Sequence, residues 1–252
     1  MAKSKTIVNT EIGVFRKSCK IKISVAGYGL VEIFISLFLA TLLISGLITQ
    51  YLQIKNGFIM AKKNMEREIE LQYTTNLIRK SIHRSGFTPC GPLSSINNNL
   101  KSIEILPNKL ITRSMAYNFS LIKNLISQNE LSLFAPIRIK KLHKLLIADC
   151  YHAEIKVVQD VTNNNSKLIL NSPLQFKYLP PIYAGEYIEE TYYTKLNNQN
   201  IPALYYRNHH SEELNSNIIE INSVQKKDIV EILLTLDNYK KRLLVSFSRI
   251  LS

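Results

Sequence analysis

The feature that most constrains the fold is an uninterrupted apolar run from Ile33 to Ile54, 22 residues long, with no charge and no proline. At about 1.5 Å per helical residue the run spans roughly 33 Å, which matches the hydrocarbon thickness of a bilayer. A buried core helix of a water-soluble protein is the alternative, but helices of this length in soluble cores usually carry a polar stripe. We therefore expect residues 28–54 to form the transmembrane half of a helix.

The charges that flank the apolar run predict its orientation. Residues 1–27 contain six Lys or Arg and one Glu, a net charge of +5, whereas the whole chain of 252 residues carries +13. Because the positively charged flank of a membrane helix stays in the cytosol, we expect residues 1–27 to be cytosolic and the chain after Lys55 to lie beyond the membrane. The remaining positive charge is a weak signal, and no specific nucleic-acid binding is expected.

The junction between the basic segment and the apolar run has an unusual order, Gly27-Tyr28-Gly29-Leu30-Val31-Glu32. In an ordinary secretory signal the cleavage site follows the apolar run, but here the small pair Ala26-Gly27 precedes it. Cleavage after Gly27 would keep the helix and expose a new amino terminus at Tyr28, with Glu32 as its fifth residue. An unpartnered carboxylate inside hydrocarbon costs on the order of several kcal/mol, so Glu32 needs an explanation.

This junction resembles the class III leader of type IV pilins and pseudopilins, in which a basic leader ends in glycine and is followed by an aromatic residue, a carboxylate at the fifth position and an apolar helix. The resemblance implies that a prepilin peptidase cleaves between Gly27 and Tyr28, and that the new amine of Tyr28 is methylated. It also implies that Glu32 is an assembly carboxylate, which pairs with that amine in its own chain or in the next subunit. The alternative is that Glu32 only reaches toward the headgroups.

The charged stretch at residues 55–85 continues the helical pattern. Apolar residues recur at spacings of three or four, and they are Phe58, Ala61, Met65, Ile69, Tyr73 and Leu77. We expect this stripe to lie on a globular head, although a charged spacer that makes no contact with the head is the alternative. The helix is expected to end near Ser85 and Gly86, just before Pro89 and Gly91.

Beyond residue 90 the pattern changes to short strands and loops. Alternation from Val230 to Leu236 and from Leu243 to Phe247 predicts a hairpin. Further strands are expected within 143–159, 166–172 and 174–179. Polar stretches rich in Asn and Ser are expected to be loops, at 92–130, 158–167 and 195–217. The predicted fold class is α+β, with the long helix covering one antiparallel sheet in a single head of residues 55–252.

Four segments, in this order along the chain, resemble PilW-type minor pilins. They are LIRKSIHRSGFTPCG (77–91), LLIADCYHAEI (145–155), NIPALYYR (200–207) and RLLVSFSRILS (242–252). The resemblance implies a structural subunit that helps to prime or cap a type IV pilus, with other minor and major pilins as partners. It implies an inner-membrane protein with a periplasmic head, which enters the pilus after processing.

The cysteines fit this topology. Cys19 falls in the cytosolic leader and is expected to stay reduced, whereas Cys90 and Cys150 fall on the oxidising periplasmic side, within the segments that resemble the family's cysteine motifs. A disulfide between them is therefore expected, and on the chain-entropy model it would stabilise the head by about 4 kcal/mol. Two free buried thiols are the alternative.

The sequence contains little that points to catalysis. It has no phosphate-binding glycine loop and no nucleophile elbow, so no catalytic residue, cofactor or metal is expected and the chain is expected not to be an enzyme. The pair His209-His210 is disfavoured as a metal site, because adjacent histidines do not share one face of a strand and no carboxylate–histidine motif accompanies them.

Other polar groups are given ordinary roles. The carboxylates at Glu189-Glu190 and Glu212-Glu213 and the basic cluster from Arg138 to Lys144 are expected to be solvated. The tyrosines are expected to pack in the head rather than to stack on bases, and they lie at positions 183, 187, 192, 193, 205 and 206.

Two other functions remain open. One is a minor pseudopilin of a type II secretion system, which would have the same leader and architecture. The other is an unprocessed single-pass membrane protein whose periplasmic head binds a ligand.

Overall fold

The computed structural model describes residues 29–96, 100–162, 166–226, 229–237 and 239–246. The chain divides into two compact units, residues 1–61 and residues 62–252. The leader, including Cys19 and the predicted cleavage junction between Gly27 and Tyr28, lies outside the described residues.

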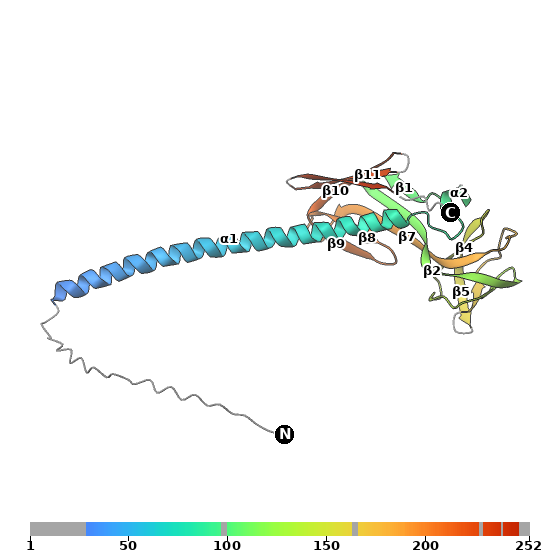
Figure 1. Ribbon diagram of the computed structural model, residues 1–252, viewed down its shortest axis with the longest axis horizontal. Helices are drawn as coiled ribbons and strands as arrows, with labels where there is room; N and C mark the ends of the chain where they lie inside the picture. Colours follow the sequence, from blue (N-terminus) through green and yellow to red (C-terminus); the bar gives the residue numbers. More distant parts are fainter. Residues whose placement is uncertain (1–28, 97–99, 163–165, 227–228, 238, 247–252) are drawn as a thin grey trace, which may run out of the picture. The chain divides into compact units, whose positions relative to one another are not determined.

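The helix α1 runs from Leu30 to Arg84 and is the first element of the chain (Figure 1). It is long and apolar enough to cross a membrane. Within the first unit its large apolar side chains from Leu30 to Ile54 are each between 49% and 72% exposed. Four hydroxyls in this stretch bond to carbonyl oxygens one turn earlier, at 2.8–2.9 Å, and so need no partner outside the helix; they belong to Ser36, Thr41, Ser45 and Thr49.

The part of α1 that belongs to the second unit packs on the head through its last four turns. The buried positions recur at helical spacing and are Leu71, Thr74, Thr75, Ile78, Ser81 and Ile82. The predicted contact stripe is therefore wrong for most of its length, because Phe58, Met65, Ile69 and Tyr73 are all more than half exposed. Of that stripe, Leu77 packs against the core.

Gly86 ends the helix where the sequence predicts. Its φ of 76° lies in the left-handed region, and a Cβ there would come within 2.5 Å of the Ser102 hydroxyl. The Gly86 amide donates to the carbonyl of Arg113 at 2.7 Å, so the chain leaves the helix already hydrogen-bonded to a strand.

The head contains twelve strands among the described residues, and all of their pairings are antiparallel. They are β1 (Ile103–Leu106), β2 (Lys109–Ser127), β3 (Glu130–Leu133), β4 (Lys144–Ala148), β5 (Ala153–Thr162), β6 (Lys167–Leu170), β7 (Tyr183–Leu196), β8 (Pro202–Arg207), β9 (Ser211–Asn215), β10 (Ile218–Lys226), β11 (Ile229–Leu236) and β12 (Lys240–Ser246). The first nine strands form one sheet and the last three form another, instead of the single sheet that we expected.

Six strands of the larger sheet close into a ring in the order β2, β3, β6, β5, β4 and β7. The ring closes because β2 is long enough to pair with β7 along its first part and with β3 near its end. Its apolar residues gather in one cluster that includes Leu131, Leu145, Ile147, Val158 and Leu168, all 0% exposed. This ring is a small barrel filled by side chains, and Figure 1 labels β2, β4 and β5 in this part of the head.

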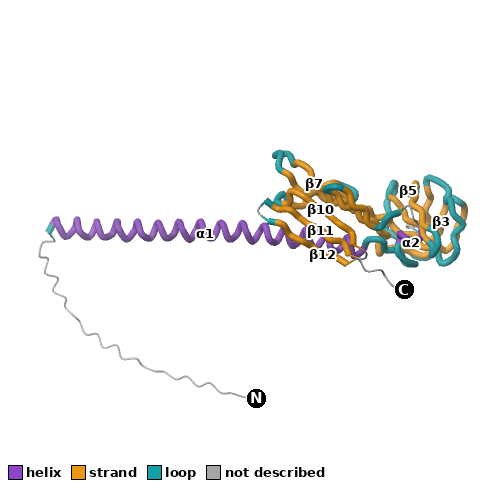
Figure 2. The backbone as a smooth tube through the Cα atoms, turned by 90° about the horizontal axis from the view of Figure 1, so that it is seen from above, coloured by secondary structure: helices purple, strands orange, loops and turns teal. Residues whose placement is uncertain are grey.

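A second core lies where α1 meets both sheets. Leu71, Ile78 and Ile82 of α1 share one cluster with Tyr192 of β7 and with the apolar faces of β10, β11 and β12. The three-stranded sheet therefore packs, together with the larger sheet, on one face of the last turns of α1 (Figure 2). The hairpin predicted near the carboxyl end is confirmed as β11 and β12.

A third cluster covers the outer wall of the barrel. The short helix α2 (Leu93–Ile96) packs there with Met115, Leu146 and Tyr187. Leu146 belongs to this cluster and Leu145 to the barrel interior, as expected because adjacent residues of a strand point to opposite faces of the sheet. Gly185 lies on the same wall, and a Cβ there would come within 2.6 Å of the Met115 side chain, which accounts for a glycine near the start of β7.

Several predicted loops are strands. β2 occupies much of 92–130, and β8 and β9 lie within 195–217. Residues 174–179, predicted as a strand, belong to no strand. The strands expected within 143–159 and 166–172 are present as β4, β5 and β6.

Candidate functional site

The apolar half of α1 carries the predicted assembly carboxylate. Glu32 lies in the first turn of the helix, and its amide donates to the carbonyl of Gly29 at 2.8 Å. A carboxylate in a first turn is favoured by the helix dipole, typically by about 0.3–1 kcal/mol. The predicted partner, the amine of Tyr28, lies outside the described residues, so the pairing stays a prediction.

The apolar surface of this segment extends around the whole helix. Large apolar side chains from Leu30 to Ile54 are exposed on every face of the helix. A cylinder of this kind cannot stay in water, because an exposed apolar area of this size drives association or membrane insertion. It requires either lipid or other apolar helices.

The charged half of α1 has a second apolar face. Met65, Ile69 and Tyr73 are 53–65% exposed and follow one another by a single helical turn. Ile69 and Leu71 are two positions apart in the helix, which is about 200° around its axis, so this face points away from the head core. Hence α1 offers one face to the head and leaves an opposite face available to a partner.

Polar contacts fix the end of α1 to the sheet. The Ser81 hydroxyl lies 2.6 Å from the hydroxyl of Tyr192, and Arg84 pairs with Glu190 at 2.8 Å. Tyr206 also donates to Glu190, at 2.8 Å. Burial and the charge of Glu190 raise the pKa of Tyr192, so that hydroxyl stays neutral.

The same contacts correct one expectation. Glu189 and Glu190 lie in β7 and not in a solvated loop, and Glu190 is only 4% exposed. The six tyrosines all lie in β7 or β8, where Tyr187, Tyr192 and Tyr205 are buried, as expected for packing residues.

Cys90 and Cys150 form the predicted disulfide, with their Cα atoms 5.0 Å apart. It ties the segment after α1 to the turn between β4 and β5. Asp149 shapes this turn: its fully buried carboxylate accepts hydrogen bonds from the amides of Tyr151 and His152 through Oδ1, and from the amide of Leu179 at 2.8 Å through Oδ2.

The electrostatics of Asp149 follow from these contacts. Burial acts to raise the pKa of Asp149, but the three amide donors outweigh it and hold that pKa below its ordinary value. The Asp-Cys pair therefore has a structural task, because the carboxylate fixes the turn that presents Cys150 to Cys90.

A groove on the outer wall is the place where a ligand-binding head would be expected to act. Its polar lining includes Lys101, Glu104, Arg113, Lys144 and Glu189. Arg113 donates to Glu104 at 2.6 Å and to Glu189 at 2.8 Å. Burial works to raise the pKa of Glu189, but Arg113 outweighs it and keeps that pKa low. Arg113 is thus paired with both carboxylates of the groove.

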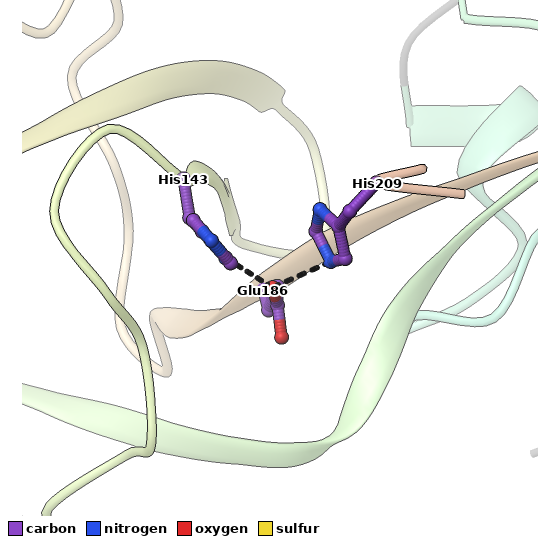
Figure 3. Close-up of side chains that lie close together, drawn as sticks. All are labelled: His143, Glu186 and His209. Carbon is purple, nitrogen blue, oxygen red and sulfur yellow. Dashed lines mark hydrogen bonds and ion pairs between the residues drawn. The ribbon is translucent and has the colours of Figure 1, made fainter. Parts of the chain in front are cut away.

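Three residues distant in sequence meet on another part of the head (Figure 3). His143 precedes β4, Glu186 belongs to β7, and His209 lies in the turn between β8 and β9. His143 Nδ1 is 2.7 Å and His209 Nε2 is 3.4 Å from the same oxygen, Oε1 of Glu186. The sequence has no carboxylate–histidine motif beside His209, but the fold brings both groups to it.

No local signal in the sequence would have revealed this cluster. His143 stands in a basic segment that reads as solvated, and Glu186 is a single carboxylate in a strand. Only the pairing of β7 with both β4 and β8 places them near the turn that holds His209.

Comparisons with known proteins give no relative. No protein-family model, curated protein or solved structure matches the chain.

Proposed function

We propose that this chain is a membrane-anchored structural subunit, a minor pilin that takes part in type IV pilus assembly. The observation that carries the proposal is α1, a single helix that is apolar on every face over a bilayer's thickness and ends in the core of a β-rich head. The class III-like leader before this helix supplies the route by which such a subunit is processed.

The proposed mechanism uses the same apolar surface twice. In the inner membrane the segment from Leu30 to Ile54 is surrounded by lipid, and in a filament it is surrounded by the equivalent helices of other pilins. Because lipid and apolar helices are similar environments for these side chains, the transfer removes little favourable burial. The outward face at Met65, Ile69 and Tyr73 then packs against a neighbouring helix.

Glu32 gives the assembled state its register. After cleavage behind Gly27, the amine of Tyr28 would carry a positive charge four residues before Glu32 in the chain. Each charge is costly to bury alone, and pairing offsets part of that cost, whether the partner belongs to the same chain or to the next subunit.

The first test is the amino terminus of the mature protein. Mass spectrometry of the membrane-extracted chain should find methylated Tyr28 as the first residue, and replacement of Gly27 by a bulky residue should block this processing. A chain that keeps residues 1–27 in cells with an active prepilin peptidase would refute the proposal and favour an unprocessed membrane protein.

The second test concerns assembly. Glu32→Gln should reduce pilus number and the co-isolation of this subunit with other pilins, because losing one member of a buried ion pair costs about 3–5 kcal/mol. Insertion and cleavage should be unchanged. Glu66→Gln is the matched control, since Glu66 is an exposed carboxylate of the same helix. Normal piliation with Glu32→Gln contradicts the role of this residue.

A further inference from the structure

We propose that His143, Glu186 and His209 form a binding site for one divalent zinc ion on the head. The site is independent of the membrane helix and goes beyond the structural role proposed above. Two imidazole nitrogens and one carboxylate oxygen are a ligand set that zinc accepts, with remaining positions filled by water.

The distances between the ligand atoms fit this ion. Zinc holds nitrogen and oxygen ligands at about 2.0–2.2 Å, so neighbouring ligand atoms in a tetrahedral site lie about 3.4 Å apart. His209 Nε2 and Glu186 Oε1 are already 3.4 Å apart. His143 Nδ1 lies 2.7 Å from the same oxygen. A small side-chain rotation that moves the two atoms about 0.7 Å further apart brings them to the distance of two zinc ligands, about 3.4 Å. All three ligand atoms lie within 4.8 Å of one another.

The backbone holds two of the ligands firmly. Glu186 is opposite Leu145 in the paired strands β7 and β4. His143 is fixed just before β4, because its carbonyl accepts from the amide of Val158 at 3.0 Å, while the amide of Leu142 donates to the carbonyl of Val158 at 2.8 Å. The site is thus largely formed before any ion binds, which reduces the ordering cost of binding.

The third ligand, His209, comes from the short turn between β8 and β9, so a bound ion would link this turn to the rest of the head. β8 pairs with β7 only as far as Arg207 opposite Thr191, and the turn with His209 follows. The His209 ring lies 4.6 Å from the His143 ring, centre to centre, and its side chain is 49% exposed, whereas those of His143 and Glu186 are 28% and 23% exposed. Zinc would fasten this accessible turn to the barrel wall, and an ion in solution can reach the site.

The neighbouring His210 provides a matched control. It lies in the same turn and is exposed, but it does not belong to the cluster. A variant at His210 therefore changes the number of histidines and the turn sequence without touching the proposed ligands.

The test is isothermal titration of zinc chloride into the purified full chain in detergent, stripped of metal, in a Cys19→Ser background that removes the leader thiol. In this background the chain with His143, Glu186 and His209 intact should bind one zinc ion. His143→Ala, Glu186→Gln and His209→Ala should each weaken binding by at least about tenfold, whereas His210→Ala should leave it unchanged.

Melting temperature gives a second readout that does not depend on the titration. Zinc should raise the melting temperature of the parent chain and of His210→Ala, but not that of His209→Ala. His209 is 49% exposed, so its replacement leaves the packing of the head intact. The proposal is overturned if the parent chain shows no saturable zinc binding, or if His210→Ala weakens binding as much as His209→Ala does.

Discussion

The buried carboxylate of Asp149 allows the sharpest test of the head structure. Asp149→Asn keeps an acceptor at Oδ1 for the amides of Tyr151 and His152, but it places an NH₂ group where Oδ2 accepts from the amide of Leu179. One hydrogen bond is therefore lost outright, and the other two lose the contribution of the negative charge.

The magnitude follows from these three contacts. A hydrogen bond to a charged group contributes about 1.5–3 kcal/mol, roughly twice a neutral one. Losing one such bond and half of two others removes the equivalent of two bonds, about 3–6 kcal/mol. For a head of this size each kcal/mol shifts the melting temperature by about 2–4 °C, so Asp149→Asn should melt about 6–24 °C lower.

The pH dependence has a defined sign. Because the pKa of Asp149 in the folded head lies below its ordinary value of 3.8, its stabilisation is fully present above pH 3.8 and is lost as the pH falls through the folded value. The difference in melting temperature between the parent chain and Asp149→Asn should therefore be constant near neutral pH and should shrink below pH 3.8.

The assay is thermal unfolding of the full chain in detergent, followed by tyrosine fluorescence, since the chain has 13 Tyr and no Trp. Asp160→Asn is the control, because the Asp160 carboxylate is 41% exposed and pairs with Lys141 at the surface. The melting temperature of this variant should stay close to that of the parent chain. An Asp149→Asn variant that melts within about 2 °C of the parent at neutral pH would refute the role assigned to this carboxylate.

Two further predictions concern the head. Cys150→Ser opens a loop whose ends are 60 residues apart, so it should cost about 4 kcal/mol and make the head more sensitive to protease without affecting membrane insertion. Free thiol at both cysteines of a parent chain kept under oxidising conditions would contradict this prediction. Ile78→Ala should lower the free energy of unfolding by about 2–5 kcal/mol, because this side chain is 0% exposed. Ile69→Ala, at an exposed position of the same helix, should leave the free energy of unfolding nearly unchanged. Equal effects of the two substitutions in urea titrations would show that the buried face of α1 is wrongly assigned.

The parts of the fold that depend on local sequence were predictable. The helix stop at Gly86 follows from the conformational freedom of glycine, and the hairpin of β11 and β12 follows from strict alternation on both strands. The fold class also follows, since a long apolar helix and alternating segments leave few other architectures.

The buried face of α1 was not predictable from its apolar spacing. Both faces of its second half contain apolar residues at helical spacing, and the face that packs on the head includes the polar Thr74, Thr75 and Ser81. Thr74 and Thr75 bond to carbonyls of α1, and Ser81 contacts Tyr192. Polar side chains with such hydrogen bonds cost little free energy to bury. The contact face of α1 therefore lacks a continuous apolar pattern that would mark it in the sequence.

Strand β2 and the histidine cluster were missed for a related reason. The pairing of β2 with β7 is irregular between Met115 and Phe119, so the alternation that marks a strand is interrupted in its middle. His143, Glu186 and His209 come together only through pairing between strands far apart in sequence. Such contacts depend on tertiary structure and leave no periodic signal.

The closed ring of six strands also governs which edges of the head a neighbouring chain can reach. Because β2 and β7 pair with each other, the ring itself has no edge strand, and the edges among the described strands are β1, β9, β10 and β12. β1 and β9 are only 4 and 5 residues long, and β12 begins with Lys240, Lys241 and Arg242. Short or strongly charged edges resist the addition of foreign strands, so the nine-residue β10 is the edge of this head that is most open to pairing with a strand of a neighbouring chain.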